Sequence, residues 1–183
     1  MNKELLSTIA GLIFIAGFIP YAIDIIRGKT KPAKASWIIW ATLDTITLAG
    51  MWAENSLNGQ IKGAVLGAWI ITILALKYGE KGWTRLEKFC LGGAVLGIAL
   101  WAIFNSPIMA LTTSVSVVFL GSIPTFISAW QDPRRESKLA WTIFWISCIF
   151  AFLAIPEMDL KNAMQPVTFF LIESIVMYIL FNR

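Results

Sequence analysis

Two acidic residues stand alone inside long apolar stretches of the sequence. Asp44 lies near the middle of the run 36–53, and Glu173 lies near the middle of the run 161–181. A carboxylate at bilayer depth costs about 2.5 kcal/mol or more, so such a residue usually faces a helix-bundle interior or a wet cavity. The chemistry that these acids predict is proton coupling or the binding of a cationic group. The structural alternative is a protonated acid that donates a hydrogen bond to a backbone carbonyl or a nearby threonine.

Tryptophan is abundant, with nine among 183 residues. Interfacial anchoring accounts for those near the ends of apolar runs. Trp40, Trp69 and Trp145 lie deeper, where an indole face can stack on a sugar ring or hold an ammonium group. Packing is an equal interpretation for each of them.

The composition excludes most familiar enzyme chemistry. The sequence has no histidine, so the usual metal ligands and the Ser-His and Cys-His nucleophile pairs are missing. Cys90 and Cys148 are isolated in apolar stretches and match neither a disulfide framework nor a metal site. We therefore expect no enzyme activity, cofactor or metal. An intramembrane enzyme would need Asp44 and Glu173 within roughly 10 Å of each other as a carboxylate pair.

The elements that position these residues are apolar and long. Of all residues, 57% are hydrophobic and only 14% are charged. A helix that spans a membrane needs about 20 apolar residues. The sequence therefore predicts an all-α integral membrane protein with seven transmembrane helices, at residues 5–26, 36–53, 58–77, 86–104, 107–130, 139–156 and 161–181.

Basic residues predict how the chain is oriented. They gather in the loops after the first, third and fifth runs, as with Arg27, Lys29, Lys31 and Lys34 after the first. Positively charged loops face the cytoplasm. The amino terminus is then outside and Arg183 inside. Because the net charge of +4 is confined to short loops, the predicted partners are membrane lipids and a small-molecule solute, not a nucleic acid.

An internal repeat appears at an offset of 104 residues. The segment GFIPYAIDIIRGKTKPAKASWIIW, residues 17–40, aligns without gaps on GSIPTFISAWQDPRRESKLAWTIF, residues 121–144. Isoleucines can match by chance between any two apolar helices. Matches of rarer residue types in one ungapped register are much less expected by chance, as at Pro20/Pro124, Trp37/Trp141 and Asn58/Asn162. The prediction is two parallel three-helix repeats, 1–80 and 107–183, joined by a linker helix in 81–106.

This 3+1+3 arrangement resembles the SWEET and PQ-loop superfamily of membrane transporters, and GKTKPAKASWIIW is similar to its small bacterial members. The family's PQ motif reads Pro20-Tyr21 in one repeat and Pro124-Thr125 in the other, so its glutamine is missing. The resemblance implies transport of a small polar solute such as a sugar or amino acid, and a location in a bacterial inner membrane. It also implies a central pocket with paired asparagines, for which Asn58 and Asn162 are the candidates.

The expected function is a solute carrier, either a facilitator or proton-coupled, that works by alternating access. The repeats would rock about Pro20 and Pro124, because an internal proline removes a helix hydrogen bond and kinks the helix. Asp44, Glu173 and the three deep tryptophans would contact the solute or a proton. A membrane receptor or scaffold of the same fold, without transport, is the alternative. Monomer and homodimer are equally compatible with the sequence.

Overall fold

A computed structural model describes residues 2–32, 34–79, 85–104 and 106–183. These residues form helices and connecting loops, with no strand among them. The helices are α1 (Lys3–Ile26), α2 (Lys34–Ala53), α3 (Gly59–Tyr78), α4 (Arg85–Phe104), α5 (Pro107–Gly121), α6 (Ile123–Gln131), the 3-10 turn η1 (Pro133–Arg135), α7 (Lys138–Ala154) and α8 (Leu160–Asn182). The repeat boundary expected at residues 80 and 81 lies outside the described residues.

Side-chain caps set the start of three long helices. Asn2 accepts hydrogen bonds from the first turn of α1, Asn58 accepts one from Ile61 N at 3.0 Å, and Asp159 accepts one from Asn162 N at 2.9 Å. Such caps satisfy backbone donors that have no partner within the helix. After α1 the chain turns at Gly28, whose φ of +70° is easily reached only by glycine.

The span expected over 107–130 is present as one apolar segment of membrane length, Pro107–Gln131, and its helix is interrupted at one residue. The structure breaks it at Ser122 into α5 and α6, and Pro124 is the second residue of α6. Proline lacks a backbone N–H and fits the first turn of a new helix. In contrast, α1 continues through Pro20 without interruption. The two repeat-matched prolines therefore occupy different local structures; the side chain of Pro124 is outside the described set.

Four segments of the described chain are long and apolar enough to cross a membrane. They are Lys3–Ile26, Gly59–Tyr78, Pro107–Gln131 and Leu160–Asn182, and the apolar α7 is shorter. Large apolar side chains such as Ile19, Ile73 and Tyr178 are exposed on the surface of the bundle. Extended apolar surface of this kind is compatible with contact to lipid.

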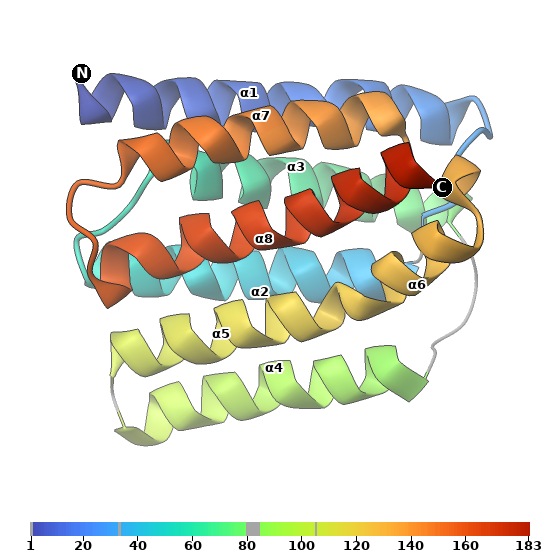
Figure 1. Ribbon diagram of the computed structural model, residues 1–183. Helices are drawn as coiled ribbons and strands as arrows, with labels where there is room; N and C mark the ends of the chain where they lie inside the picture. Colours follow the sequence, from blue (N-terminus) through green and yellow to red (C-terminus); the bar gives the residue numbers. More distant parts are fainter. Residues whose placement is uncertain (1, 33, 80–84, 105) are drawn as a thin grey trace.

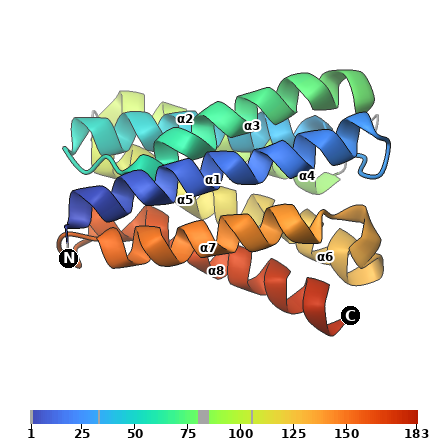
Figure 2. The ribbon, with the colours of Figure 1, turned by 90° about the horizontal axis from the view of Figure 1, so that it is seen from above.

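The helices lie side by side along one direction (Figure 1). Helix α1 packs against α3 and α7, and α2 packs against α3 and α5. Helix α8 lies against α7, α5 and α6, while α4 is at the edge of the bundle beside α5 (Figures 1 and 2). We call the end where α1, α3 and α8 begin the Asn58 end. The opposite end, where α1 ends and α7 begins, is the Glu136 end.

A face of three glycines on α3 allows α1 to approach closely. Gly59, Gly63 and Gly67 recur at four-residue spacing, which places them on one face of the helix. A Cβ atom added at Gly63 would lie 2.6 Å from the backbone oxygen of Gly11 in α1. Because backbone blocks that space, the two helices would have to separate to accept a side chain. Small residues permit this kind of close packing in membrane helices.

We expect Gly63→Ala to lower the melting temperature of the detergent-purified protein by several degrees. The added methyl group overpacks the contact between α1 and α3, a change that typically costs about 1–3 kcal/mol. Gly92→Ala in α4 is the matched control, since nothing lies within 4 Å of its Cβ position. The control should be neutral or slightly stabilising, because glycine is a poor helix former. Equal melting temperatures for the two variants would contradict the close α1–α3 packing.

Candidate functional site

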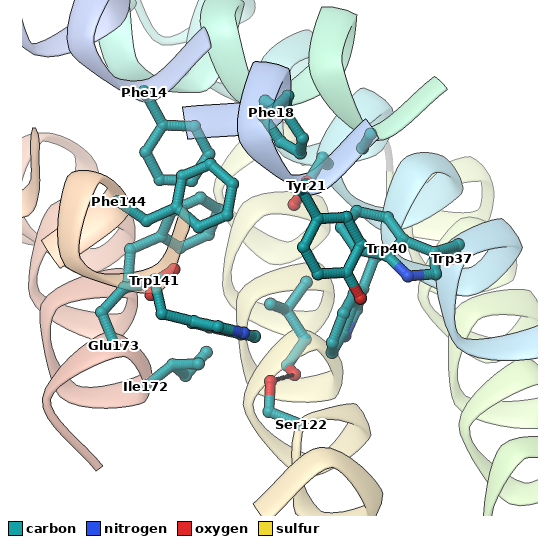
Figure 3. Close-up of a pocket in the computed structure, with 14 residues that line it drawn as sticks. Phe14, Phe18, Tyr21, Trp37, Trp40, Ser122, Trp141, Phe144, Ile172 and Glu173 are labelled. Carbon is teal, nitrogen blue, oxygen red and sulfur yellow. Dashed lines mark hydrogen bonds between the residues drawn. The ribbon is translucent and has the colours of Figure 1, made fainter. Parts of the chain in front are cut away.

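A cavity of about 70 Å³ lies at the centre of the bundle. It is lined from α1, α2, α3, α5, α7 and α8, and by the residue that separates α5 from α6. Figure 3 shows its lining side chains converging from opposite helices. They are Phe14, Phe18, Tyr21, Trp37, Trp40, Asp44, Ala68, Val118, Ser122, Trp141, Phe144, Phe169, Ile172 and Glu173.

Aromatic rings form most of the cavity wall. The ring of Phe144 in α7 lies 4.8 Å from that of Phe14 and 4.7 Å from that of Phe18, between ring centroids. On the other side, Trp37 packs edge-on against Trp40 at 5.2 Å and lies 5.3 Å from Tyr21. These contacts join α1 to α2 and α7, so the wall is a closely packed part of the hydrophobic core.

Three polar atoms in this cavity have no hydrogen-bond partner among the described residues. They are Asp44 Oδ1, Glu173 Oε2 and Trp40 Nε1, and all three atoms are buried. Both carboxyl residues are only 6% exposed. Native proteins satisfy nearly all buried polar groups, since an unpaired one costs about 1–3 kcal/mol. Three such atoms around one cavity therefore mark it as a place where a polar ligand can bind.

Glu136 and the residues that it contacts form a polar cluster at the Glu136 end of the cavity. Glu136 Oε2 accepts a hydrogen bond from Trp141 Nε1 at 2.8 Å and a long one from the Tyr21 hydroxyl at 3.5 Å. Beside it, the Ser137 hydroxyl donates to Asp24 Oδ2 at 2.7 Å. We call these five residues the Glu136 cluster. Because Tyr21 and Asp24 are on α1, the cluster ties the end of α1 to the segment that precedes and begins α7.

Sequence reasoning missed Glu136, because it follows Arg134 and Arg135 in what reads as a solvated basic loop. The two arginines instead approach Asp132, at 2.9 and 3.9 Å. Burial raises the pKa of Glu136 to about 7, against the opposing effect of the hydrogen bonds from Trp141 and Tyr21. The repeat itself could have indicated that Glu136 is buried, because it matches Trp37 to Trp141 and so places the start of α7 in the core.

Glu136→Gln should make the protein more stable relative to the parent at high pH than at low pH. In the parent, the folded-state pKa of about 7 exceeds the ordinary value of 4.5. The folded state thus holds the proton more tightly, and ionisation lowers the free energy of unfolding as pH rises between these two values. Melting temperatures at about pH 5 and about pH 8 test this, and the exposed Glu157→Gln serves as control. Equal pH slopes for parent and Glu136→Gln would contradict it.

Two buried glutamines form a polar layer on the other side of the cavity. Gln60 and Gln165 are both 0% exposed, and Gln165 Nε2 donates to Gln60 Oε1 at 3.0 Å. Gln60 Nε2 donates to Cys148 Sγ at 3.1 Å and to Ser147 Oγ at 3.4 Å. Gln165 Oε1 accepts from Asn58 Nδ2 at 2.7 Å. We call Gln60, Gln165, Ser147 and Cys148 the glutamine layer.

The glutamine layer separates the central cavity from a second one at the Asn58 end. This second cavity has a volume of about 240 Å³ and is lined by Asn58 and Pro166 among others. Along α3, Gln60 lies between Asn58 and the Ala68 of the central cavity. Along α8, Gln165 lies between Asn162 of the second cavity and Phe169 of the central cavity. The layer therefore stands between the two cavities in both helices.

The structure brings together three of the residues singled out from the sequence. Asp44, Glu173 and Trp40 all line the central cavity. Asn58 and Asn162 both line the second cavity instead. Asn162 Nδ2 donates to the capping residue Asp159 at 2.8 Å.

The two other tryptophans do not line the central cavity. Trp69 is 43% exposed, and its Nε1 donates to Thr45 Oγ1 at 3.1 Å. Trp145 donates from Nε1 to Ser174 Oγ at 3.0 Å and stacks on Phe170. The sequence did not distinguish them from Trp40, because all three lie deep in apolar helices. The rotation of each helix about its axis decides which residues the indole contacts.

No cluster of three or more Cys, Asp or Glu residues in the described part of the chain is arranged to hold a metal ion. Comparison with protein-family models, with curated proteins and with solved structures finds no match to this chain.

Proposed function

We propose that this protein is a membrane carrier for a small polar solute, and that it works by alternating access through the central cavity. The observation that carries the proposal is the convergence of three unpaired buried polar atoms, from Trp40, Asp44 and Glu173, on one aromatic-walled cavity. A polar solute would supply their missing partners. A purely structural core has no need of such atoms, because apolar side chains would fill the space at lower cost.

The proposed architecture is seven spanning helices in two parallel three-helix repeats with α4 as linker, as in the SWEET and PQ-loop superfamily. In support, α3 packs on both α1 and α2, while α8 packs on both α7 and α5. The packing of α1 on α7 is matched by the packing of α5 on α2. Polar contacts join the same helix pairs: Ser147 in α7 donates to Ala10 O in α1, and Thr47 in α2 bonds Ser114 in α5.

Two closures flank the cavity in the proposed transport cycle. The glutamine layer blocks the path to the Asn58 end, and the Glu136 cluster joins α1 to α7 at the opposite end. Opening one while the other stays closed would expose the cavity to one side at a time. Pro20 directly precedes Tyr21 of the Glu136 cluster, which suits a bend at that point of α1. Pro124, at the start of α6, is the proposed counterpart.

The proposed orientation places the Asn58 end outside and the Glu136 end in the cytoplasm of a bacterial cell. Support comes from the basic residues near the Glu136 end, among them Arg27, Arg134 and Arg135. Asp44 and Glu173 are the proposed proton-coupling groups, because each carboxyl has a buried oxygen without a partner among the described residues and can exchange a proton for a ligand.

Reconstitution into liposomes tests the proposed function. Vesicles that contain the purified protein would be supplied with labelled sugars, amino acids or amines, and uptake followed with and without a proton gradient. The expected result is saturable uptake of one class of solute, absent from protein-free vesicles. Saturable binding without uptake would favour the receptor alternative and overturn the carrier.

A further inference from the structure

The central cavity is lined by two acids and by no lysine or arginine among the described residues. A third acid, Glu136, contacts the lining residues Tyr21 and Trp141 from the end of the cavity. A cationic group would be attracted to this site, whereas an anionic group would be repelled, since charges interact strongly where water is excluded. Charge therefore distinguishes among polar solutes.

The cavity wall also favours an organic cation over a bare metal ion. Rings of Phe, Tyr and Trp supply most of the lining, and oxygen ligands are few. Organic ammonium groups bind well over aromatic faces, with tryptophan the best of them. Small hard metal ions instead need a shell of oxygen ligands.

The position of Trp40 adds a second requirement. Trp40 and Asp44 are four residues apart on α2, so their side chains are neighbours on one face of that helix. Glu173 comes from α8, across the cavity in Figure 3. The free indole N–H of Trp40 needs an acceptor, which an ammonium group cannot provide. A hydroxyl can accept from Trp40 and donate to Asp44 at the same time.

The size of the cavity limits the group that it holds. Its volume of about 70 Å³ is under half that of an engineered cavity that accepts benzene, which is roughly 150 Å³. A six-membered sugar ring is therefore too large for the cavity in this conformation. A short chain with one polar group at each end is a better match.

We propose that the central cavity binds a small primary amine with a hydroxyl group a short distance from its ammonium group. The ammonium group is held by Glu173 and the aromatic faces, and the hydroxyl lies between Trp40 and Asp44. This inference rests on the proposed function, because it names the solute class of the same cavity.

Three compounds of nearly equal size separate the two interactions: 2-aminoethanol, propylamine and ethylene glycol. Propylamine lacks the hydroxyl, and ethylene glycol lacks the positive charge. Binding to the detergent-purified parent is measured by the ligand-dependent rise in melting temperature. We expect 2-aminoethanol to bind at least about 3–10-fold more tightly than propylamine, because propylamine lacks the hydroxyl that bonds both Trp40 and Asp44. We expect ethylene glycol to bind at least about tenfold more weakly than 2-aminoethanol, as loss of a charged hydrogen bond implies.

Three variants test which residues contact the hydroxyl and the ammonium group. Trp40→Phe keeps an aromatic face but removes the N–H, so it should weaken the binding of 2-aminoethanol and leave that of propylamine unchanged. Glu173→Gln should weaken both amines at least about tenfold. Glu157→Gln, an exposed acid outside the cavity, is the charge control and should bind as the parent does. The melting temperature without ligand shows in each case that the variant is folded.

Clear outcomes would overturn the inference. Equal affinity for ethylene glycol and 2-aminoethanol, or unchanged amine binding in Glu173→Gln, would rule out a cation site. These outcomes differ from failure of the carrier proposal. Selective amine binding without uptake into liposomes would support this inference and overturn the carrier proposal. Saturable uptake of an uncharged solute would support the carrier proposal and overturn this inference.

Discussion

Asp44→Asn and Glu173→Gln should each reduce solute uptake into liposomes by about tenfold or more while raising the melting temperature of the protein. Uptake falls because each substitution removes an acid with a buried oxygen, Asp44 Oδ1 or Glu173 Oε2, that has no partner among the described residues and can bind the solute. A hydrogen bond to a charged group contributes about 1.5–3 kcal/mol, or roughly one to two powers of ten in affinity. Stability rises because an unpaired buried carboxylate is costly to the folded state.

The opposite signs of the two effects make this prediction specific. A variant that merely misfolds loses both uptake and thermal stability. Glu157→Gln makes the same chemical change on an exposed acid and should leave both quantities as in the parent. Full uptake by Asp44→Asn and Glu173→Gln would show that neither acid contacts the solute or a coupled proton, and the central cavity would lose its assigned role.

Gln165→Ala should increase the reactivity of Cys148 toward a membrane-impermeant maleimide by about tenfold or more. Cys148 is 0% exposed and contacts Gln60, the direct partner of Gln165. Removing the Gln165 amide leaves Gln60 Oε1 and the Asn58 amide without that partner, a loss of about 1–3 kcal/mol that favours opening of the layer. The measurement is the labelling rate in a Cys90→Ala background, so that Cys148 is the only thiol.

Asn162→Ala is the matched control for this experiment. It removes an amide that also lines the second cavity but bonds Asp159 rather than the glutamine layer. Its labelling rate should equal that of the parent. In sealed vesicles, reagent added on the side of the Asn58 end should label Cys148 in Gln165→Ala, and reagent on the other side should not. Equal labelling of all variants, or labelling from the Glu136 end, would contradict the glutamine layer as a closure.

Much of the helical organisation follows from local sequence. The helices begin and end within about two residues of the apolar runs, because loops are marked by charged residues, by Gly28 and by caps such as Asn58. The exception is the break at Ser122. A proline in an apolar run is compatible both with a continuous helix, as at Pro20, and with a new start, as at Pro124. Surrounding packing decides between them.

The candidate site was only partly predictable. Asp44 and Glu173 stood out because a charged residue in an apolar run is costly whichever way the helix is rotated about its axis. Gln60 and Gln165 did not, because each lies near the start of a helix, where an amide is usually a solvated residue. Glu136 was hidden by the arginines before it, and its burial depends on Tyr21 from a helix far away in sequence.

The sequence by itself determined the helical class, the length of each apolar segment, the end where basic residues gather and the two acids that need a polar environment. These properties depend on composition and on neighbours along the chain. Only the tertiary structure decided that Trp40 lines the cavity with both acids while Trp69 does not, and that two glutamines meet across α3 and α8. Helices that are apolar on all sides carry little periodic signal, so their rotation is set by contacts between helices.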